Sequence, residues 1–378
     1  MIPYLYKQTY HGTGNSDRIG PLPAWIECKV TEERNGEFFL EGTLPVGGRN
    51  TEELAVDRII MAASAPPKAG GYLPMQPFRI RTIEKNNDVI AVTAFHVTYQ
   101  LTENIIKPTA SIQDESVQYI FDQLLNQSGS LSGFIIPPLN SAFHFVSDIT
   151  LEDPIYPSHD SPVSVRAWLG GNDGLISMIT GKISDQGEVL PEPEIEWNGW
   201  TISLKKHRGA VLDKSVAYAR NMDTMDYAVN ANGLVTGYYG WWRGATFTDC
   251  IIYESNSSDF SYVRVVSVDL SSEFETEPTQ AQMEEYLEAY ADKLAANHLP
   301  TSITVTAVPD ALQGVFLCDT ITVIHPEMKV KQTAKVVKTV YDVIRDRYDS
   351  ITIGAIRPAI TDTIAKMIRT EYPRFTGG

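Results

Sequence analysis

The stretch GVFLCDTITVIHPEMKVKQTAKVVKTVYDVIRDRYDSITIG, residues Gly314–Gly354, is the part of the sequence that most clearly indicates a fold. It contains three successive runs rich in β-branched and aromatic residues, Val315–His325, Val330–Ile344 and Tyr348–Ile353. Short polar segments separate these runs. Such a pattern is typical of an antiparallel meander, in which consecutive strands pair side by side. The stretch therefore predicts three neighbouring strands of one sheet.

The middle run of this meander carries apolar residues on both of its faces. Side chains alternate between the two faces of a strand, so every second residue shares a face. One face holds Val337, Tyr341 and Val343, and the other holds Val336, Val340 and Ile344. A strand that is apolar on both faces is either enclosed in a barrel or covered by another subunit. We therefore expect a small closed barrel that also contacts a partner.

Composition limits the possible classes of protein. The chain has 378 residues, 43% hydrophobic and 21% charged, which fits a globular protein of several domains. Its formal net charge of −16 argues against a protein that grips nucleic acid directly. The three cysteines are scattered and predict neither a disulfide framework nor a metal site. The N-terminus does not resemble a signal peptide, and no apolar run is long enough to span a membrane.

Strand-rich and helical segments alternate along the chain. Residues 1–105 are rich in strand-like runs, and Asn35-Gly36 lies between two of them as a strong hairpin signal. A second hairpin is expected around Asn198-Gly199. Apolar residues at helical spacing predict helices at Gln113–Gln127 and Thr276–Asn297, where Met283, Tyr286, Leu287, Tyr290 and Leu294 form the stripe. The fold class is therefore α+β.

A short helix is also expected at Val163–Leu169. Ser161 supplies a possible N-cap, and Pro162 suits the first helical position.

The sequence contains few arrangements that suggest catalysis. The seven histidines show no spacing suited to a metalloprotease. Cys318, Asp319 and His325 could form a thiol nucleophile with its base, but the same residues also fit an ordinary strand. Glu192, Glu194 and Glu196 alternate along one run, which is more typical of a solvated strand edge than of a glycosidase pair. We predict no catalytic, metal or cofactor-binding residues and no cofactor.

One aromatic cluster remains as a candidate recognition site. Tyr238, Tyr239, Trp241 and Trp242 could stack on sugars or be buried in the core or in a subunit contact, and we favour burial. Together with Val337 and Tyr341, they are the candidate subunit-interface or recognition residues.

Several blocks, in matching order, resemble the prophage endopeptidase tail family, hub proteins of phage tail tips also called tail-associated lysins. The opening block is CKVTEERNGEFFLEGTLPV. The second block is Phe78-Arg79-Ile80 with His96, Tyr99 and Leu101. The central block consists of Trp197-Asn198-Gly199, His207-Arg208-Gly209 and Tyr218–Met222. The last blocks are the helix Thr276–Asn297 and the meander. The resemblance covers residues 25–365.

The resemblance implies an architecture like that of the central baseplate hub of contractile phages, with two small antiparallel β-barrel domains and a split α+β domain. The implied parts are 1–105 as the first barrel, 106–204 and 262–299 as the α+β domain, 205–261 and 300–354 as the second barrel, and 355–378 as a C-terminal helix and tail.

The function implied is that of a non-enzymatic virion structural protein. A homotrimeric ring at the virion tail tip would join the tail tube to a spike or fibre and surround the DNA channel. Its partners would be the distal tail protein ring, the tape-measure protein and the spike or fibre, while DNA passes without specific binding. We expect synthesis in the host bacterial cytoplasm, without a signal peptide, and no membrane insertion.

Two other functions stay open. Many relatives continue into a domain that cuts cell wall, and we expect that domain either to be a separate chain here or to have been cut off after the meander. The alternative function is a cell-wall-degrading endopeptidase, as the family name suggests. A third class is a host-surface glycan-binding module that uses the aromatic cluster.

Overall fold

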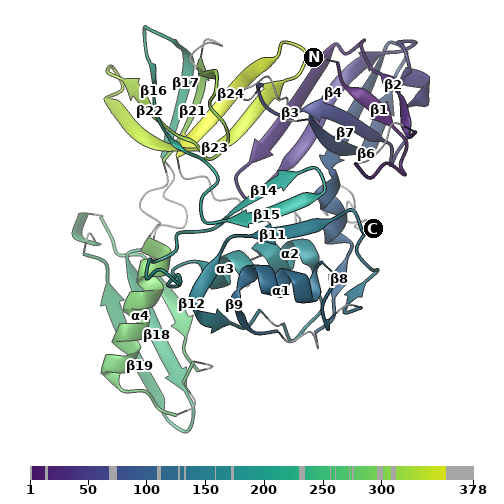
Figure 1. The fold of residues 1–378 in the computed structure, drawn as a ribbon. Coiled ribbons are helices and arrows are strands. Elements are labelled where there is room, and N and C mark those ends of the chain that lie inside the picture. Colours follow the sequence, from purple (N-terminus) through teal and green to yellow (C-terminus); the bar gives the residue numbers. More distant parts are fainter. Residues whose placement is uncertain are drawn as a thin grey trace, which may run out of the picture. The chain divides into compact units, whose positions relative to one another are not determined.

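The structure is a computed structural model. It describes the chain except for residues 1, 13–15, 68–74, 109–111, 127, 132, 158, 172–173, 230–234, 256, 260, 272, 275, 296–300, 308–311 and 355–378. The predicted C-terminal helix and tail lie outside the described residues. The chain divides into two compact units, the first formed by Met1–Asp226 with Ile303–Gly378 and the second by Tyr227–Ser302. Figure 1 shows their elements.

The N-terminal part of the first unit is an antiparallel set of strands. The predicted hairpin is confirmed as β3 (Glu27–Glu33) and β4 (Phe38–Pro45), and Asn35 takes the left-handed conformation in its turn, with φ 53°. The set continues through β7 (Val89–His96), β6 (Met75–Lys85), β5 (Ile59–Ala63), β1 (Tyr4–Tyr6) and β2 (Arg18–Pro21). Short 3-10 helices lie at Thr51–Glu53 and Val97–Thr102.

The meander is confirmed. Its strands are β22 (Thr320–His325), β23 (Val330–Asp342) and β24 (Arg347–Gly354), and each pairs antiparallel with the next. Three further strands extend this part of the sheet. They are β16 (Val211–Ala217), parallel to β22, then β21 (Thr301–Ala307) beside β24, and β17 (Met222–Val229) beside β21.

The two expected closed barrels are not confirmed, because the N-terminal and C-terminal strands share one sheet. β23 is 13 residues long, so its two halves have different neighbours. Its first half pairs with β22, whereas Lys338–Asp342 pair antiparallel with β3. The result is a 13-stranded sheet, and no strand pairing in the described part of the chain closes it into a barrel.

An α+β region lies between these strands in the sequence. The predicted second hairpin is confirmed as β14 (Glu194–Asn198) and β15 (Thr201–Lys205), and β11 (His144–Ser147) pairs parallel with β15. The helices are α1 (Val117–Leu124), α2 (Val165–Gly170) and α3 (Leu175–Ile179). The smaller strands are β8 (Ile105–Ile106), β9 (Asp114–Ser116), β10 (Ile135–Ile136), β12 (Thr150–Ile155) and β13 (Val163–Ser164).

The start expected for the second of these helices is wrong. Its N-cap is Ser164, whose Oγ accepts a hydrogen bond from the backbone N of Ala167 at 3.2 Å. Val163 and Ser164 first pair with β8 as a short strand, so the helix begins later than Ser161-Pro162 suggested.

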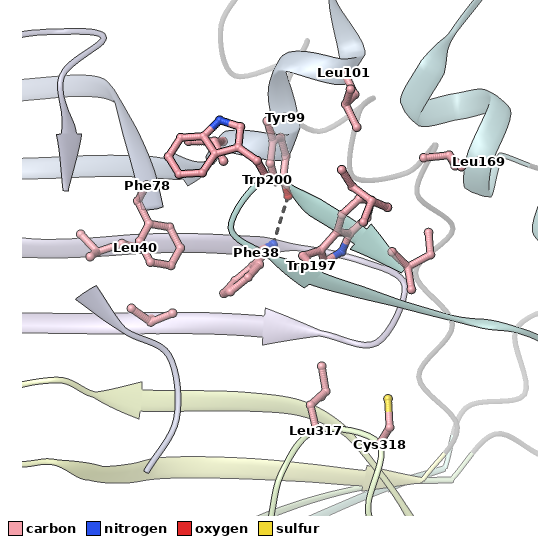
Figure 2. Close-up of a cluster of buried hydrophobic side chains, with 14 of the residues drawn as sticks. Phe38, Leu40, Phe78, Tyr99, Leu101, Leu169, Trp197, Trp200, Leu317 and Cys318 are labelled. Carbon is pink, nitrogen blue, oxygen red and sulfur yellow. Dashed lines mark hydrogen bonds between the residues drawn. The ribbon is translucent and has the colours of Figure 1, made fainter. Parts of the chain in front are cut away.

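One hydrophobic core joins all parts of the first unit. It runs from the N-terminal strands through the α+β region to the meander. Figure 2 shows side chains from each, including Phe38, Trp197 and Leu317, with the hydroxyl of Tyr99 accepting a hydrogen bond from the backbone N of Phe38 at 3.2 Å. Shared burial of this kind makes the three parts fold as one body.

The second unit is a three-stranded sheet with one long helix. β18 (Gly237–Arg243) pairs antiparallel with β19 (Phe247–Tyr253) and parallel with β20 (Val265–Asp269). A short 3-10 helix, Ser257–Asp259, precedes β20. The helix is α4 (Gln280–Ala295), and its predicted stripe buries Met283 and Leu287 against the sheet. The side chain of Leu294 lies outside the described residues.

This unit divides the chain differently from the expected boundaries. The resemblance implies a barrel over 205–261 and the α+β domain over 262–299, whereas in the structure β18 and β19 pack with β20 and α4. Gly240 permits this packing, because a Cβ there would lie 2.9 Å from the side chain of Leu287.

Gly209 lies close against the backbone of Cys318, and this contact gives a first testable prediction. A Cβ at Gly209 would lie 2.1 Å from the backbone C and O of Cys318, where no side chain can move aside. We expect Gly209→Ala to lower the free energy of unfolding by about 1–3 kcal/mol or more. Urea denaturation measures this. The exposed Asp213→Ala should change stability by less than about 0.5 kcal/mol, and equal effects of the two substitutions would contradict the close contact.

Candidate functional site

The predicted aromatic cluster is divided between the two faces of β18. Tyr238 and Trp242 are buried under α4, whereas Tyr239 and Trp241 are partly exposed on the opposite face. The Tyr238 hydroxyl donates to Glu254 Oε1 at 3.1 Å, and burial together with this carboxylate raises the pKa of Tyr238 to about 12. Trp242 Nε1 donates to the carbonyl of Phe274 at 3.0 Å. These two residues are therefore core residues of the second unit.

The other two aromatic residues are held on the open face by hydrogen bonds to neighbouring strands. The Tyr239 hydroxyl donates to Asp249 Oδ2 on β19 at 2.6 Å, and Trp241 Nε1 donates to Ser267 Oγ on β20 at 3.0 Å. A recognition or interface role for Tyr239 and Trp241 stays a prediction.

Val337 and Tyr341 lie inside the core of the first unit. Tyr341 is fully buried, its ring centroid lies 5.7 Å from that of Tyr348, and its hydroxyl donates to Asp346. Burial, followed by this hydrogen bond, raises the pKa of Tyr341. Of the six apolar residues expected on the two faces of this run, Val340 is partly exposed and Ile344 is exposed, whereas the other four are buried. An interface on this strand would therefore use these two residues.

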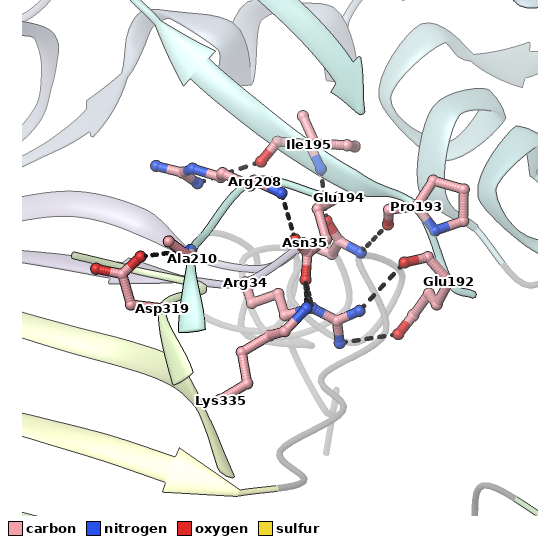
Figure 3. A network of polar contacts seen from close by, with 10 residues as sticks. All are labelled: Arg34, Asn35, Glu192, Pro193, Glu194, Ile195, Arg208, Ala210, Asp319 and Lys335. Atoms are coloured by element: carbon pink, nitrogen blue, oxygen red, sulfur yellow. Dashed lines mark hydrogen bonds and ion pairs between the residues drawn. The ribbon is translucent and has the colours of Figure 1, made fainter. Parts of the chain in front are cut away.

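A buried ionic junction, which the sequence did not predict, surrounds Glu194 (Figure 3). The Glu194 side chain is fully buried on β14. Its Oε1 accepts from Arg34 Nε at 2.7 Å and from the ammonium of Lys335, and its Oε2 accepts from the backbone N of Arg208 at 2.7 Å. These donors come from the β3–β4 turn, from β23 and from the segment after β15. One carboxylate thus joins three parts of the chain.

Two further groups extend the junction. Arg208 Nη2 lies 2.6 Å from Glu32 Oε1, and although burial alone would lower the pKa of Arg208, neighbouring charges led by Glu32 raise it above its ordinary value. Asn35 donates to the carbonyl of Pro193 and accepts from the backbone N of Ile195, both at 2.8 Å. The β3–β4 turn is therefore fixed to the start of β14.

Glu194 is an anchor rather than a proton donor. Burial raises its pKa, but the hydrogen bonds from Lys335 and from the Arg208 backbone, together with the charge of Arg34, hold the pKa below its ordinary value. The carboxyl group therefore stays ionised, which does not suit a general acid. The interpretation of Glu192, Glu194 and Glu196 as a solvated edge is wrong for Glu194, because its partners come from distant segments that no local pattern reveals.

Cys318, Asp319 and His325 have separate structural roles. Asp319 accepts hydrogen bonds from the backbone N of Ala210 at 2.8 Å and of Phe316 at 2.7 Å. The His325 ring stacks on Tyr218 with centroids 4.1 Å apart. Burial raises the pKa of Cys318 to about 12, so the thiol is protonated at neutral pH. Their arrangement does not provide an activated nucleophile.

A cavity of about 160 Å³ lies beside the junction. Glu32, Arg208, Asp319 and Tyr348 are among its lining residues, so it is polar and large enough for ordered water. In the part of the chain that the structure describes, no three His, Cys, Asp or Glu side chains gather in a way that could hold a metal ion. None of the described helices is both long and apolar enough to cross a membrane.

The junction predicts a large effect of Glu194→Gln. This change leaves Arg34 and Lys335 facing a neutral amide, so we expect a loss of about 3 kcal/mol in the free energy of unfolding. Glu192→Gln is the matched control, since its partly exposed pair with Arg34 should contribute less than about 1 kcal/mol. Equal losses for the two variants would contradict the central role of Glu194.

The same variants predict a pH dependence. Because the pKa of Glu194 is lowered in the folded protein, its contribution is complete above the ordinary value of 4.5 and is lost as the pH falls through the folded pKa. The stability difference between the parent protein and Glu194→Gln should therefore shrink below pH 4.5. Urea denaturation over a pH series measures it, and a difference that grows on acidification would refute the assignment.

The thiols give a further prediction. Cys28, Cys250 and Cys318 are buried with raised pKa values, so an alkylating reagent should modify them slowly in the native protein and fully after unfolding. Mass spectrometry of the labelled protein measures this. Rapid native labelling of Cys318 would instead support a nucleophilic role.

Comparison with known proteins places this geometry among phage tail components. The prophage endopeptidase tail family model matches residues 212–364. No curated protein sequence matches the chain.

Solved structures with a similar fold cover nearly the whole chain. Prophage tail protein gp18 from Listeria monocytogenes EGD-e is 11% identical with a TM-score of 0.54, over 98% of this chain and 99% of that protein. The 43 kDa tail protein of prophage MuSo2 from Shewanella oneidensis is 9% identical with a TM-score of 0.56, over 95% and 99%. The tail protein from Neisseria meningitidis MC58 is 10% identical with a TM-score of 0.57, over 96% and 99%. The chain thus matches the prophage endopeptidase tail family over residues 212–364, and its fold is that of prophage tail proteins.

Proposed function

We propose that this protein is a structural component of a phage or prophage tail tip, a baseplate hub that assembles as a homotrimeric ring. The observation that carries the proposal is the fold, which matches three prophage tail proteins over nearly their full lengths. In this role the ring joins the tail tube to a spike or fibre and surrounds the DNA channel. Its partners are the distal tail protein ring, the tape-measure protein and the spike or fibre.

The internal construction of the first unit supports such a role. A subunit of such a ring contacts proteins above and below it. Its N-terminal and C-terminal groups of strands must therefore keep the same relative position when these partners exert force on the ring. Here β3 and β23 pair directly, and the Glu194 junction connects the β3–β4 turn, β14 and β23. Buried ion pairs of this kind tolerate few alternative arrangements, because a displaced partner leaves a charge buried without compensation.

The surface of β23 supplies a candidate subunit contact. Val340 and Ile344 are apolar and remain accessible, whereas the buried Val337 and Tyr341 are not available to a partner. We propose that Val340 and Ile344 lie at the contact between copies in the ring.

The charge of the chain fits passage of DNA. With a net charge of −16, the protein repels phosphate groups at a distance set by salt screening. DNA would therefore move through the ring without specific binding.

Light scattering of the purified chain tests the ring. We expect a mass near three times 42.0 kDa at high protein concentration. Ile344→Asp should shift the population towards monomer, because it places a charge in an apolar contact, whereas Val146→Asp, at a similarly exposed site on β11, should not. A monomer at every concentration, or equal effects of the two substitutions, would contradict self-assembly through this strand.

A further inference from the structure

Among the described residues of the second unit, α4 covers one face of the three-stranded sheet, and the other face carries exposed aromatic and apolar side chains. α4 packs on the face that carries Tyr238 and Trp242, and the opposite face carries Tyr239 and Trp241 on the central strand. Beside them on the outer strands lie Phe247, Ile251, Tyr253 and Val265, whose exposed fractions are 57%, 42%, 56% and 49%. Large apolar side chains gathered on one face in this way are typical of a binding surface.

The two central rings are hydrogen-bonded to the neighbouring strands. Trp241 pairs with Asp249 of β19 and with Asp269 of β20. Its Nε1, however, donates to the Oγ of Ser267, which lies two residues before Asp269 on β20. Tyr239 faces Ile251, yet its hydroxyl reaches Asp249 on β19. The polar edge of each ring is therefore bound to a neighbouring strand, and the apolar part of each ring remains partly exposed.

Hydrogen-bond acceptors surround these rings. Asp249 and Asp269 flank Trp241 on the two outer strands, and both are exposed. Carboxylate oxygens accept several hydrogen bonds each, so both acids keep capacity for donors from a ligand. The surface therefore combines flat apolar rings with acceptors at their edges.

We propose that this face binds a neutral glycan chain of β-1,4-linked pyranoses. Such a chain is a flat ribbon whose sugar rings present apolar C–H faces to aromatic rings and carry hydroxyl donors along their edges. The carboxylates disfavour anionic polysaccharides through repulsion. A protein partner would usually be anchored by aromatic side chains that insert into pockets, whereas the polar edges of these two rings are already held by hydrogen bonds within the sheet.

The site is distinct from the ring contact proposed above, and it differs from the cluster expected from the sequence. The aromatic residues of the proposed site are Tyr239 and Trp241, whereas Tyr238 and Trp242 are buried on the other face. Its hydrogen-bond acceptors, the carboxylates of Asp249 and Asp269, come from β19 and β20.

Saturation-transfer NMR and calorimetry on the full-length chain test the proposal with cellohexaose and chitohexaose as β-1,4-linked probes. Maltohexaose, which is α-linked and curved, is the ligand control. The chain should bind at least one β-linked probe more tightly than maltohexaose. Trp241→Ala should weaken that binding three- to tenfold, the range expected for one aromatic stacking contact, and Tyr239→Ala with Trp241→Ala should weaken it more than tenfold.

Matched variants separate binding from folding. Trp241→Phe keeps an aromatic face and should retain most of the affinity. Tyr156→Ala removes an exposed aromatic ring from the first unit and should leave binding unchanged. Thermal unfolding should be nearly unaffected by Trp241→Ala, because Trp241 lies outside the core formed with α4.

Three results would overturn the proposal. The first is that neither β-linked probe binds to the parent protein. The second is that binding survives the double substitution unchanged. The third is that Trp241→Ala alters the mass of the assembly while neither probe binds, which would make this face a protein contact.

Discussion

The first unit depends on one buried carboxylate. Isolating an ionised group from water costs several kcal/mol unless its partners are in place, and Glu194 finds those partners on three segments that are far apart in sequence. In the observed arrangement of the β3–β4 turn, β14 and β23, both of its oxygens have hydrogen-bond donors. The hydrophobic core supplies most of the stability of these parts, since burial scales with area, but burial alone is not directional. The ionic contacts of Glu194 require particular donors at particular positions, and so they specify how the three segments are arranged.

Local patterns in the sequence predicted the elements better than their assembly. The meander and both hairpins follow from alternation and turn residues, which act over a few positions. The Glu194 contacts could not be predicted in this way, because Arg34 and Glu194 are 160 residues apart. The shared sheet was missed for a related reason: the length of β23 indicates a long strand but not that its two halves pair with different neighbours.

The aromatic cluster shows how far residue type can be interpreted without structure. Four adjacent aromatic residues allowed either burial or recognition, and strand alternation divides them, two to each face. The alternation can be read from the sequence. Which of the two faces α4 covers depends on tertiary packing, which the sequence pattern does not indicate. No local pattern shows that β20 pairs in parallel with β18 rather than with β19, the strand before it in the sequence.

The second unit is an insertion, and its point of attachment has a consequence for how the chain can be altered. The chain leaves the large sheet at β17 and returns at β21, and these two strands are neighbours in that sheet. A segment whose two ends meet at adjacent strands can be lengthened, shortened or exchanged as a cassette, since a short loop between the same strands would restore the parent fold. Replacing the residues between β17 and β21 should therefore leave the pairing of these two strands unchanged.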